Sequence, residues 1–363
     1  MNNPHPFESV SVLFMHQEQI FAVQRQPYLL AFPGYHAFPG GKIDASESST
    51  PFETKFLCEH NSLRMHALQR EIIEELGYDL EKGIRNGEVL SVSELAEALA
   101  PPFSPVRFRT WFYRIDLKER INFKADSGEF TNSFWSSAKE MLDNFHSGKS
   151  LMVPPTRWVL AGLLKNPLAT EFGDLSQNFA EEYRVPCMEM LDGIPMFAVR
   201  SDTLPPASRT NVFLLGDTDS AKLLVDPSPN SEEEFQRLQN TIKDKEIDAI
   251  FLTHHHPDHH QFSNQLALKL KIPIILSQDT QQRLTEKHGE SYFEDVELRN
   301  ASENEEVTHW HGSVVRVYEI PGHDAGQLGL APDSMAWFIV GDLIQGIGTV
   351  VISAPEGDMA TYF

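Results

Sequence analysis

The chain has 363 residues, which is long enough for two compact domains that each bury a core. Hydrophobic residues make up 41% of the chain and charged residues 23%, a globular composition that excludes fibrous, collagen-like and wholly disordered proteins. The formal net charge of −22 repels polyanions and so disfavours nucleic acid as a partner, although a bound metal can reverse the field at one site and RNA stays open.

The cellular setting follows from the cysteines and from the absence of long apolar runs. Cys58 and Cys187 are too few for a disulfide scaffold, which fits a reducing cytoplasm. Residues 1–12 have neither a basic nor an apolar region of a secretion signal, and no run approaches eighteen apolar residues. We therefore expect a cytoplasmic protein that does not contact a membrane, with its oligomeric state left open.

The first half is expected to mix strands and helices. Two apolar runs separated by four polar residues predict a hairpin over residues 9–22, and apolar spacing predicts a helix over His66–Leu76 that ends at Gly77. Further strands are predicted at Arg107–Ile115 and Phe130–Trp135, and further helices at Ala138–Phe145 and Pro155–Leu164.

In the second half, short apolar strands alternate with amphipathic helices. We place a first domain at residues 1–168, a linker at 169–182 and a second domain at 183–363. The predicted strands are Asn211–Leu215, Lys222–Asp226, Ala249–Thr253, Ile274–Leu276, Val314–Ile320 and Met335–Val340, and the predicted helices are Ser231–Lys243 and Gln261–Leu270. The acidic run at residues 303–306 is expected to be a solvated loop.

Three glutamates share one face of the helix that ends at Gly77. Glu71, Glu74 and Glu75 are spaced i, i+3 and i+4, so their side chains project from the same side. Like charges this close destabilise a helix unless a cation lies among them, and Mg²⁺ and Mn²⁺ prefer carboxylate oxygens together with substrate phosphates. The alternative is an exposed acidic face, since surface helices are often rich in glutamate.

The surrounding residues resemble the Nudix signature. That signature has five residues between a glycine and a glutamate, then seven residues, and then Arg-Glu-aliphatic-x-Glu-Glu-x-Gly-aliphatic. Gly41, Glu47 and residues 70–78 match it. In this chain an insert of about fifteen residues, roughly Ser48 to Arg64, lengthens the spacing between Glu47 and Arg70. Because a loop insertion costs little closure entropy, the glutamate helix can still form.

The Nudix resemblance implies an α/β/α sandwich with a mixed sheet. It implies that Glu71, Glu74 and Glu75 bind Mg²⁺ or Mn²⁺, that Glu74 and Glu75 are catalytic, and that Arg70 pairs with a carboxylate such as Glu47. The runs at residues 24–27, 38–41 and 105–112 resemble the branch that cleaves coenzyme A and acyl-CoA diphosphates. This implies a small-molecule diphosphate substrate, with substrate-binding residues at Arg25, Gly40 and Gly41.

Histidines are concentrated after one predicted strand of the second half. Five histidines and an aspartate occur in residues 254–260, directly after the apolar run Ala249–Leu252. Such a density has no use in core packing, whereas neutral imidazoles are the favoured ligands of zinc and similar metals. Loops at the carboxyl ends of strands are also where α/β sheets place their chemistry.

This region resembles the metallo-β-lactamase fold family, whose His-x-His-x-Asp-His motif matches residues 254–259. Residues 321–326 are similar to that family's Gly-His-Thr-x-Gly element, and residues 340–342 to the segment that carries its bridging aspartate. The resemblance implies an αββα sandwich with Zn²⁺ or another transition metal, up to two ions. Its metal ligands would be His254, His256 and His323 for one ion, Asp258 and His259 for the second, and Asp342 between both.

One ligand of that family has no counterpart here. Relatives supply a further histidine after the bridging aspartate, and no histidine follows His323 in this chain. We therefore expect the second domain to be truncated at its C-terminal end, or its second metal site to be incomplete. His309 and His311 fit no part of the motif.

Together these patterns predict an α+β protein that is a two-domain metallohydrolase. The Nudix-like half would hydrolyse a diphosphate bond in a nucleoside-diphosphate-linked compound. The lactamase-like half would hydrolyse an ester, thioester or phosphodiester bond with a metal-bound hydroxide, and Asp258 would be its catalytic carboxylate. The alternative is that the Nudix-like half alone is catalytic and the other half is a non-catalytic metal-binding or interaction module.

Overall fold

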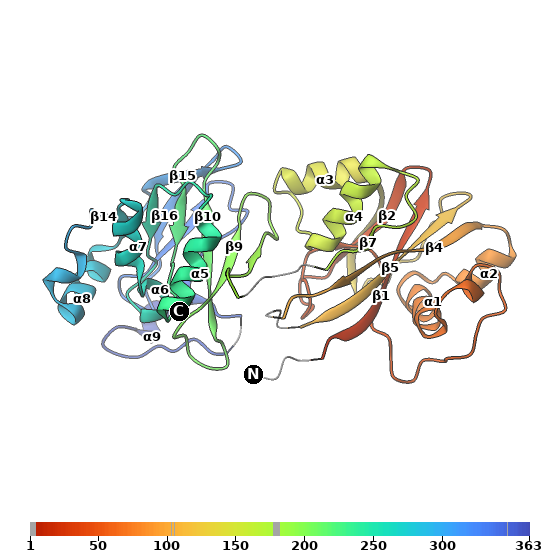
Figure 1. The fold of residues 1–363 in the computed structure, drawn as a ribbon, viewed down its shortest axis with the longest axis horizontal. Coiled ribbons are helices and arrows are strands. Elements are labelled where there is room, and N and C mark those ends of the chain that lie inside the picture. Colours follow the sequence, from red (N-terminus) through yellow and green to blue (C-terminus); the bar gives the residue numbers. More distant parts are fainter. Residues whose placement is uncertain (1–4, 103, 105, 177–181, 347) are drawn as a thin grey trace. The chain divides into compact units, whose positions relative to one another are not determined.

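A computed structural model describes residues 5–102, 104, 106–176, 182–346 and 348–363 (Figure 1). The chain divides into two compact units, Met1–Asn178 and Phe179–Phe363. The predicted linker lies where the two units meet in sequence, and its residues 177–181 lie outside the described residues. Residues 173–174 of that linker form a short strand in the sheet of the first unit.

The first unit is built on a seven-stranded mixed sheet of order β3-β2-β1-β5-β4-β7, with β6 paired to β2. Strands β1 and β5 run parallel, whereas β1–β2 and β4–β5 are antiparallel. Its strands are β1 Phe7–His16, β2 Gln19–Arg25, β3 His36–Ala37, β4 Val89–Leu99, β5 Phe108–Leu117, β6 Phe130–Ser137 and β7 Gly173–Asp174. Its helices are α1 Ser62–Leu76, α2 Leu80–Arg85, α3 Ala138–His146 and α4 Pro154–Lys165, with a 3-10 turn at Leu57–Glu59.

Helices cover both faces of this sheet because the apolar residues of β1 alternate. Val10, Val12 and Phe14 pack in one core cluster with α1, and Leu13 and Met15 pack in another with α3 and α4. Figure 1 shows α1 and α2 on one side of the strands and α3 and α4 on the other. The expected α/β/α sandwich with a mixed sheet is therefore confirmed.

The second unit contains two sheets. The larger has the order β14-β13-β12-β11-β10-β9-β8, in which β11 to β14 are mutually parallel, and the smaller has the order β15-β16-β17. The strands are β8 Cys187–Met188, β9 Met196–Arg200, β10 Arg209–Leu215, β11 Leu223–Val225, β12 Ala249–Phe251, β13 Ile274–Leu276, β14 Leu298–Asn300, β15 Glu306–Trp310, β16 Ser313–Glu319 and β17 Leu328–Pro332. The helices are α5 Glu232–Ile242, α6 Pro257–His260, α7 Ser263–Leu270, α8 Gln278–His288 and α9 Met359–Tyr362, with 3-10 turns at Glu290–Phe293 and Gly341–Leu343.

Strand β12 shows how these layers are held together. Ile250 packs in a cluster with residues of α5, α7 and α8, whereas Ala249 and Phe251 face a cluster with Val315 and Leu330 of the smaller sheet. Because side chains alternate along a strand, one face of the larger sheet carries helices and the other carries the second sheet. This helix–sheet–sheet layering, with the short α9 near the C-terminus, agrees with the expected αββα class.

Several expected elements differ from the observed ones. Residues 335–340 were expected to form a strand, and this prediction is wrong: a turn follows β17, Met335 has a φ of 51°, and Ile339 forms an isolated bridge to Leu330. Helix α1 begins at Ser62 instead of His66, with Asn61 accepting a hydrogen bond from the Arg64 amide. It ends at the predicted Gly77, which has a left-handed φ of 63°.

Among the described residues, no helix combines the length and the apolar character that crossing a membrane requires.

Candidate metal centre

The histidine-rich loop starts from a strand buried on both faces. Strand β12 ends at Phe251, and the chain continues through Leu252 and Thr253 into a loop that carries three consecutive histidines. Pro257 then occupies the first turn of α6, a position that suits a residue without a backbone N–H. The buried strand before the loop and the short helix after it hold His254 and His256 on a fixed backbone.

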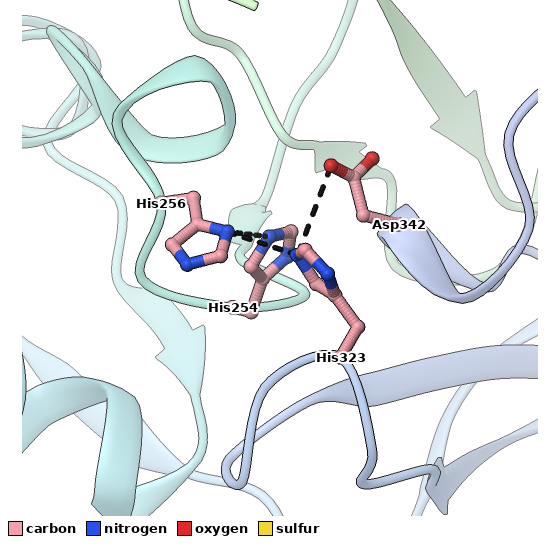
Figure 2. Close-up of side chains that lie close together, drawn as sticks. All are labelled: His254, His256, His323 and Asp342. Atoms are coloured by element: carbon pink, nitrogen blue, oxygen red, sulfur yellow. Dashed lines mark hydrogen bonds and ion pairs between the residues drawn. The ribbon is translucent and has the colours of Figure 1, made fainter. Parts of the chain in front are cut away.

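The nitrogens of three histidine rings converge on one point (Figure 2). Nδ1 of His256 lies 3.1 Å from Nε2 of His254 and 2.9 Å from Nε2 of His323. His323 comes from the loop between β16 and β17, so strands of both sheets lead into the cluster. Asp342, which follows β17, places Oδ2 3.8 Å from Nε2 of His323. The ligand atoms of these four residues all lie within 4.8 Å of one another.

This donor set fits a divalent metal. Ring nitrogens held about 2.0–2.1 Å from a tetrahedral metal are themselves about 3.3–3.4 Å apart, close to the separations seen here. Burial and the neighbouring histidines hold the pKa of His254 well below its usual value, and burial likewise lowers the pKa of His256. Both rings are therefore neutral near pH 7, which is the form that donates a lone pair to a metal.

A second group of possible ligands adjoins the first and shares Asp342. It consists of Asp258, His259 and Asp342, with Nε2 of His259 3.2 Å from Oδ1 of Asp342 and 3.8 Å from Oδ2 of Asp258. Burial opposes charge on His259, yet the carboxylates of Asp226 and Asp342 raise its pKa well above the usual value. Burial also opposes charge on Asp342, but its contact with His259 lowers the pKa of this carboxyl to about 2.

Asp226 is a site residue that the sequence analysis treated only as the end of a strand. Its carboxylate accepts hydrogen bonds from the backbone N–H and hydroxyl of Thr253, at 2.8 and 2.7 Å, and lies 2.8 Å from Nδ1 of His259. It is buried and has a φ of 52°, a conformation that few non-glycine residues adopt. The sequence signal that could have identified Asp226 is its position directly after a buried parallel strand.

All six predicted ligands of the second unit thus lie together. Asp342 belongs to both groups, and its role as a bridging ligand stays a prediction. His309 and His311 take no part, because they pair with Glu306 and Asp192 away from the cluster.

In the first unit, the predicted glutamates lie around an arginine. Arg70 donates to Glu47 at 2.8 Å, as expected, and also to Glu71 at 2.8 Å and Glu74 at 3.2 Å. Glu75 instead accepts a hydrogen bond from the Gly40 amide at 2.7 Å. Among the described residues, the groups of three or more ligands within 4.8 Å of one another all belong to the second unit, so the metal role of these glutamates stays a prediction.

The predicted substrate-binding glycines lie against the glutamate helix. A Cβ on Gly41 would lie 2.2 Å from Oε1 of Glu71, and a Cβ on Gly40 would lie 2.2 Å from the carbonyl oxygen of Val10. Burial raises the pKa of Glu75 to about 8, although the Gly40 N–H and the charge of Arg25 act in the opposite direction. Arg25, Gly40 and Gly41 thus lie in the neighbourhood of Glu71 and Glu75.

Residues 205–363 match the family model of the metallo-beta-lactamase superfamily. Over 142 residues the chain is 30% identical to a hydroxyacylglutathione hydrolase from Wigglesworthia glossinidia brevipalpis, a match that covers 38% of this chain. The chain spans about half, 47%, of the length of that relative.

Two solved structures illustrate the range of structural neighbours. A NUDIX hydrolase from Alicyclobacillus acidocaldarius is 20% identical, with a TM-score of 0.37 over 45% of this chain and 93% of that one. A metallo-beta-lactamase from Pontibacter korlensis is 14% identical, with a TM-score of 0.39 over 49% of this chain and 81% of that one. From the family match and the observed sheets and helices, the second unit of this α+β protein has the metallo-β-lactamase fold.

Proposed function

We propose that the second unit is a metal-dependent hydrolase. The observation that carries this proposal is the convergence of the ring nitrogens of His254, His256 and His323 beside Asp342. Zn²⁺ or another transition metal held there, up to two ions, would make bound water more acidic and polarise a substrate carbonyl or phosphoryl group.

The protein's own groups have distinct roles in this proposal. His254, His256 and His323 would hold the first ion, His259 and Asp258 the second, and Asp342 would contact both. Nε2 of His259 lies 3.8 Å from Asp258 and 3.2 Å from Asp342, so Asp258 has the looser contact with this ring. It would therefore orient the attacking water and accept its proton as the catalytic carboxylate.

Among possible substrates, a thioester is favoured. The curated relative is named a hydroxyacylglutathione hydrolase, and its similarity to this chain supports the hydrolysis of an acyl thioester over a lactone or a phosphodiester. The test is turnover of acyl-glutathione, acyl-CoA, lactone and phosphodiester substrates after loading with Zn²⁺, by wild type and by His256→Ala. Thioester turnover that is lost in the variant supports the proposal, whereas turnover of none of these substrates contradicts it.

We propose further that residues 1–168 of the first unit form a Nudix-type diphosphatase domain that acts with Mg²⁺ or Mn²⁺. Supporting this are the signature residues on α1 and the position of Gly40 and Gly41 against Glu75 and Glu71. Glu71, Glu74 and Glu75 would bind the metal, and Arg25, Gly40 and Gly41 would contact a small-molecule diphosphate such as CoA or acyl-CoA. In the cytoplasm, a CoA thioester could then be a substrate of both units.

A diphosphate-hydrolysis screen over CoA, acyl-CoAs, NAD(H) and ADP-ribose tests the first unit. Glu74→Gln with Glu75→Gln should abolish cleavage while the unfolding transition is kept, and unchanged turnover would refute these assignments. The same preparations decide the alternative in which the second unit is a non-catalytic module. In that case diphosphate cleavage is retained, and no thioester turnover depends on His256.

A further inference from the structure

Each of the three converging histidines has a second ring nitrogen that points away from the cluster. Nδ1 of His254 contacts the hydroxyl of Thr253 at 3.0 Å. Nδ1 of His323 lies 2.7 Å from the carbonyl oxygen of Val351, and Nε2 of His256 lies 3.3 Å from Oε2 of Glu356. Two of the three outer contacts thus come from residues 351–356, which contain none of the predicted ligands.

This segment is fixed against the loop that carries His323. The Asp358 amide donates to the carbonyl of Gly322 at 2.9 Å, and the Gly357 amide donates to Ser353 at 2.7 Å. A Cβ on Gly357 would lie 2.8 Å from the carbonyl oxygen of His323, so only glycine allows this approach. The backbone on either side of Glu356 is therefore held while its side chain reaches the histidine loop.

Glu356 contacts a second histidine, which is itself held by a carboxylate. Its Oε1 lies 3.4 Å from Nε2 of His255, and Nδ1 of His255 lies 2.5 Å from Oδ2 of Asp324. Glu356, His255 and Asp324 thus form a continuous chain of polar contacts from His256 to the residue next to His323. His255 and Asp324 are buried, whereas the Glu356 side chain is 38% exposed.

We propose that Glu356 is a positioning residue for the metal ligand His256, an inference that rests on the metal centre of the proposed function. If Nδ1 of His256 donates its lone pair to the metal, the ring proton must lie on Nε2, and this N–H donates to Glu356. The carboxylate therefore selects the ligating tautomer and fixes the plane of the ring. Outer partners of this kind typically change metal affinity about 10- to 100-fold when they are removed.

The substitution Glu356→Gln distinguishes the effect of the hydrogen bond from the effect of the negative charge. In Glu356→Gln the amide oxygen can still accept from Nε2 of His256, and the amide nitrogen can donate to Nε2 of His255. Glu356→Ala removes both contacts. Because the Glu356 side chain is partly exposed on a loop, neither change should lower the thermal stability of the metal-free chain. Glu286→Ala on α8, where Glu286 contacts Gln282, is the matched control.

The experiment titrates Co²⁺ into the metal-free full chain, following the visible absorption of the bound ion and competition with a chelator. We expect Glu356→Ala to bind Co²⁺ about 10- to 100-fold more weakly with an altered spectrum. Glu356→Gln and Glu286→Ala should stay near wild type.

Wild-type affinity and spectrum in Glu356→Ala would overturn the positioning role and leave the metal centre standing. A loss in Glu356→Gln as large as in Glu356→Ala would also overturn it, because charge and not an acceptor would then be required. No Co²⁺ binding by the wild type would overturn both this inference and the proposed function of the second unit.

Discussion

The substitution Asp226→Asn should selectively weaken binding of the proposed second metal ion. Oδ1 of Asp226 accepts from the Thr253 amide at 2.8 Å, and Oδ2 lies 2.8 Å from Nδ1 of His259. To bind a metal, His259 must be neutral, with its proton on Nδ1 against Asp226 and its Nε2 lone pair on the side of Asp342 and Asp258. With asparagine, the oxygen must stay on the Thr253 amide, so the amide nitrogen would face Nδ1 and force the ring proton onto Nε2.

The cost can be estimated from the alternative orientation of the asparagine. Turning the amide over restores the ligating tautomer of His259 but leaves the buried Thr253 N–H without an acceptor, which costs about 1–3 kcal/mol. At about 1.4 kcal/mol for each factor of ten, the second ion should bind about 5- to 150-fold more weakly. In this turned orientation the amide oxygen takes the place of Oδ2, so it still accepts from the Thr253 hydroxyl, and that hydroxyl keeps its contact with His254. The first ion should therefore bind as in the wild type.

Competition with a chelator, combined with counting of bound Zn²⁺ per chain, measures both affinities. Asp217→Asn is the matched control, because Asp217 also accepts from two backbone amides, those of His311 and Gly312, and contacts none of the ligands. Equal weakening of both ions, or full retention of the second, would refute the tautomer argument.

Three other predictions concern the remaining structure. Gly41→Ala should displace Glu71, since the added Cβ would lie 2.2 Å from its carboxylate. Mn²⁺ binding, measured by electron paramagnetic resonance, should weaken by about tenfold or more, while the melting temperature, measured by calorimetry, should not fall. Arg114→Ala should destabilise the first unit by about 3 kcal/mol in urea unfolding, because it removes the buried guanidinium that donates to Asp116 and to the carbonyls of Pro167 and Ala169. Phe251→Ala should cost the second unit about 3–5 kcal/mol in the same assay, and a loss below 1 kcal/mol would contradict the packing of β12 between two layers.

The helices and strands of both units could be predicted from the sequence where apolar residues recur at regular intervals. Strand β4 is an element in which they do not. Val89–Leu99 forms the longest strand of the first sheet among the described residues, yet it was missed. Bulges between Val89 and Ser91 and between Glu94 and Ala96 shift the register, so buried residues do not alternate in sequence. Helix α8 was missed for a related reason, since Thr280 and Leu284 are its only buried residues.

Residues of the metal centre could likewise be predicted only where the sequence itself carries a pattern. His254, His256 and Asp258 follow one another within a single loop, so their spacing could be read from the sequence. Glu356 contacts His256 across 100 residues, and its own neighbours contain no pattern that indicates a role. The apolar residues at 335–340 indicated a strand, but the chain turns after Pro332 and pairs only through Ile339.

The ligand set draws on both sheets of the second unit, since His254 and His256 follow β12 while His323, 67 residues from His256 in sequence, comes from the β16–β17 loop. An ion held by these side chains would link the two sheets at one edge. An opening motion that separates these loops to expose the apolar layer would then have to break contacts to the ion. Amide hydrogen exchange of β12 and β16 in the metal-loaded protein should therefore be limited by the rate at which metal dissociates.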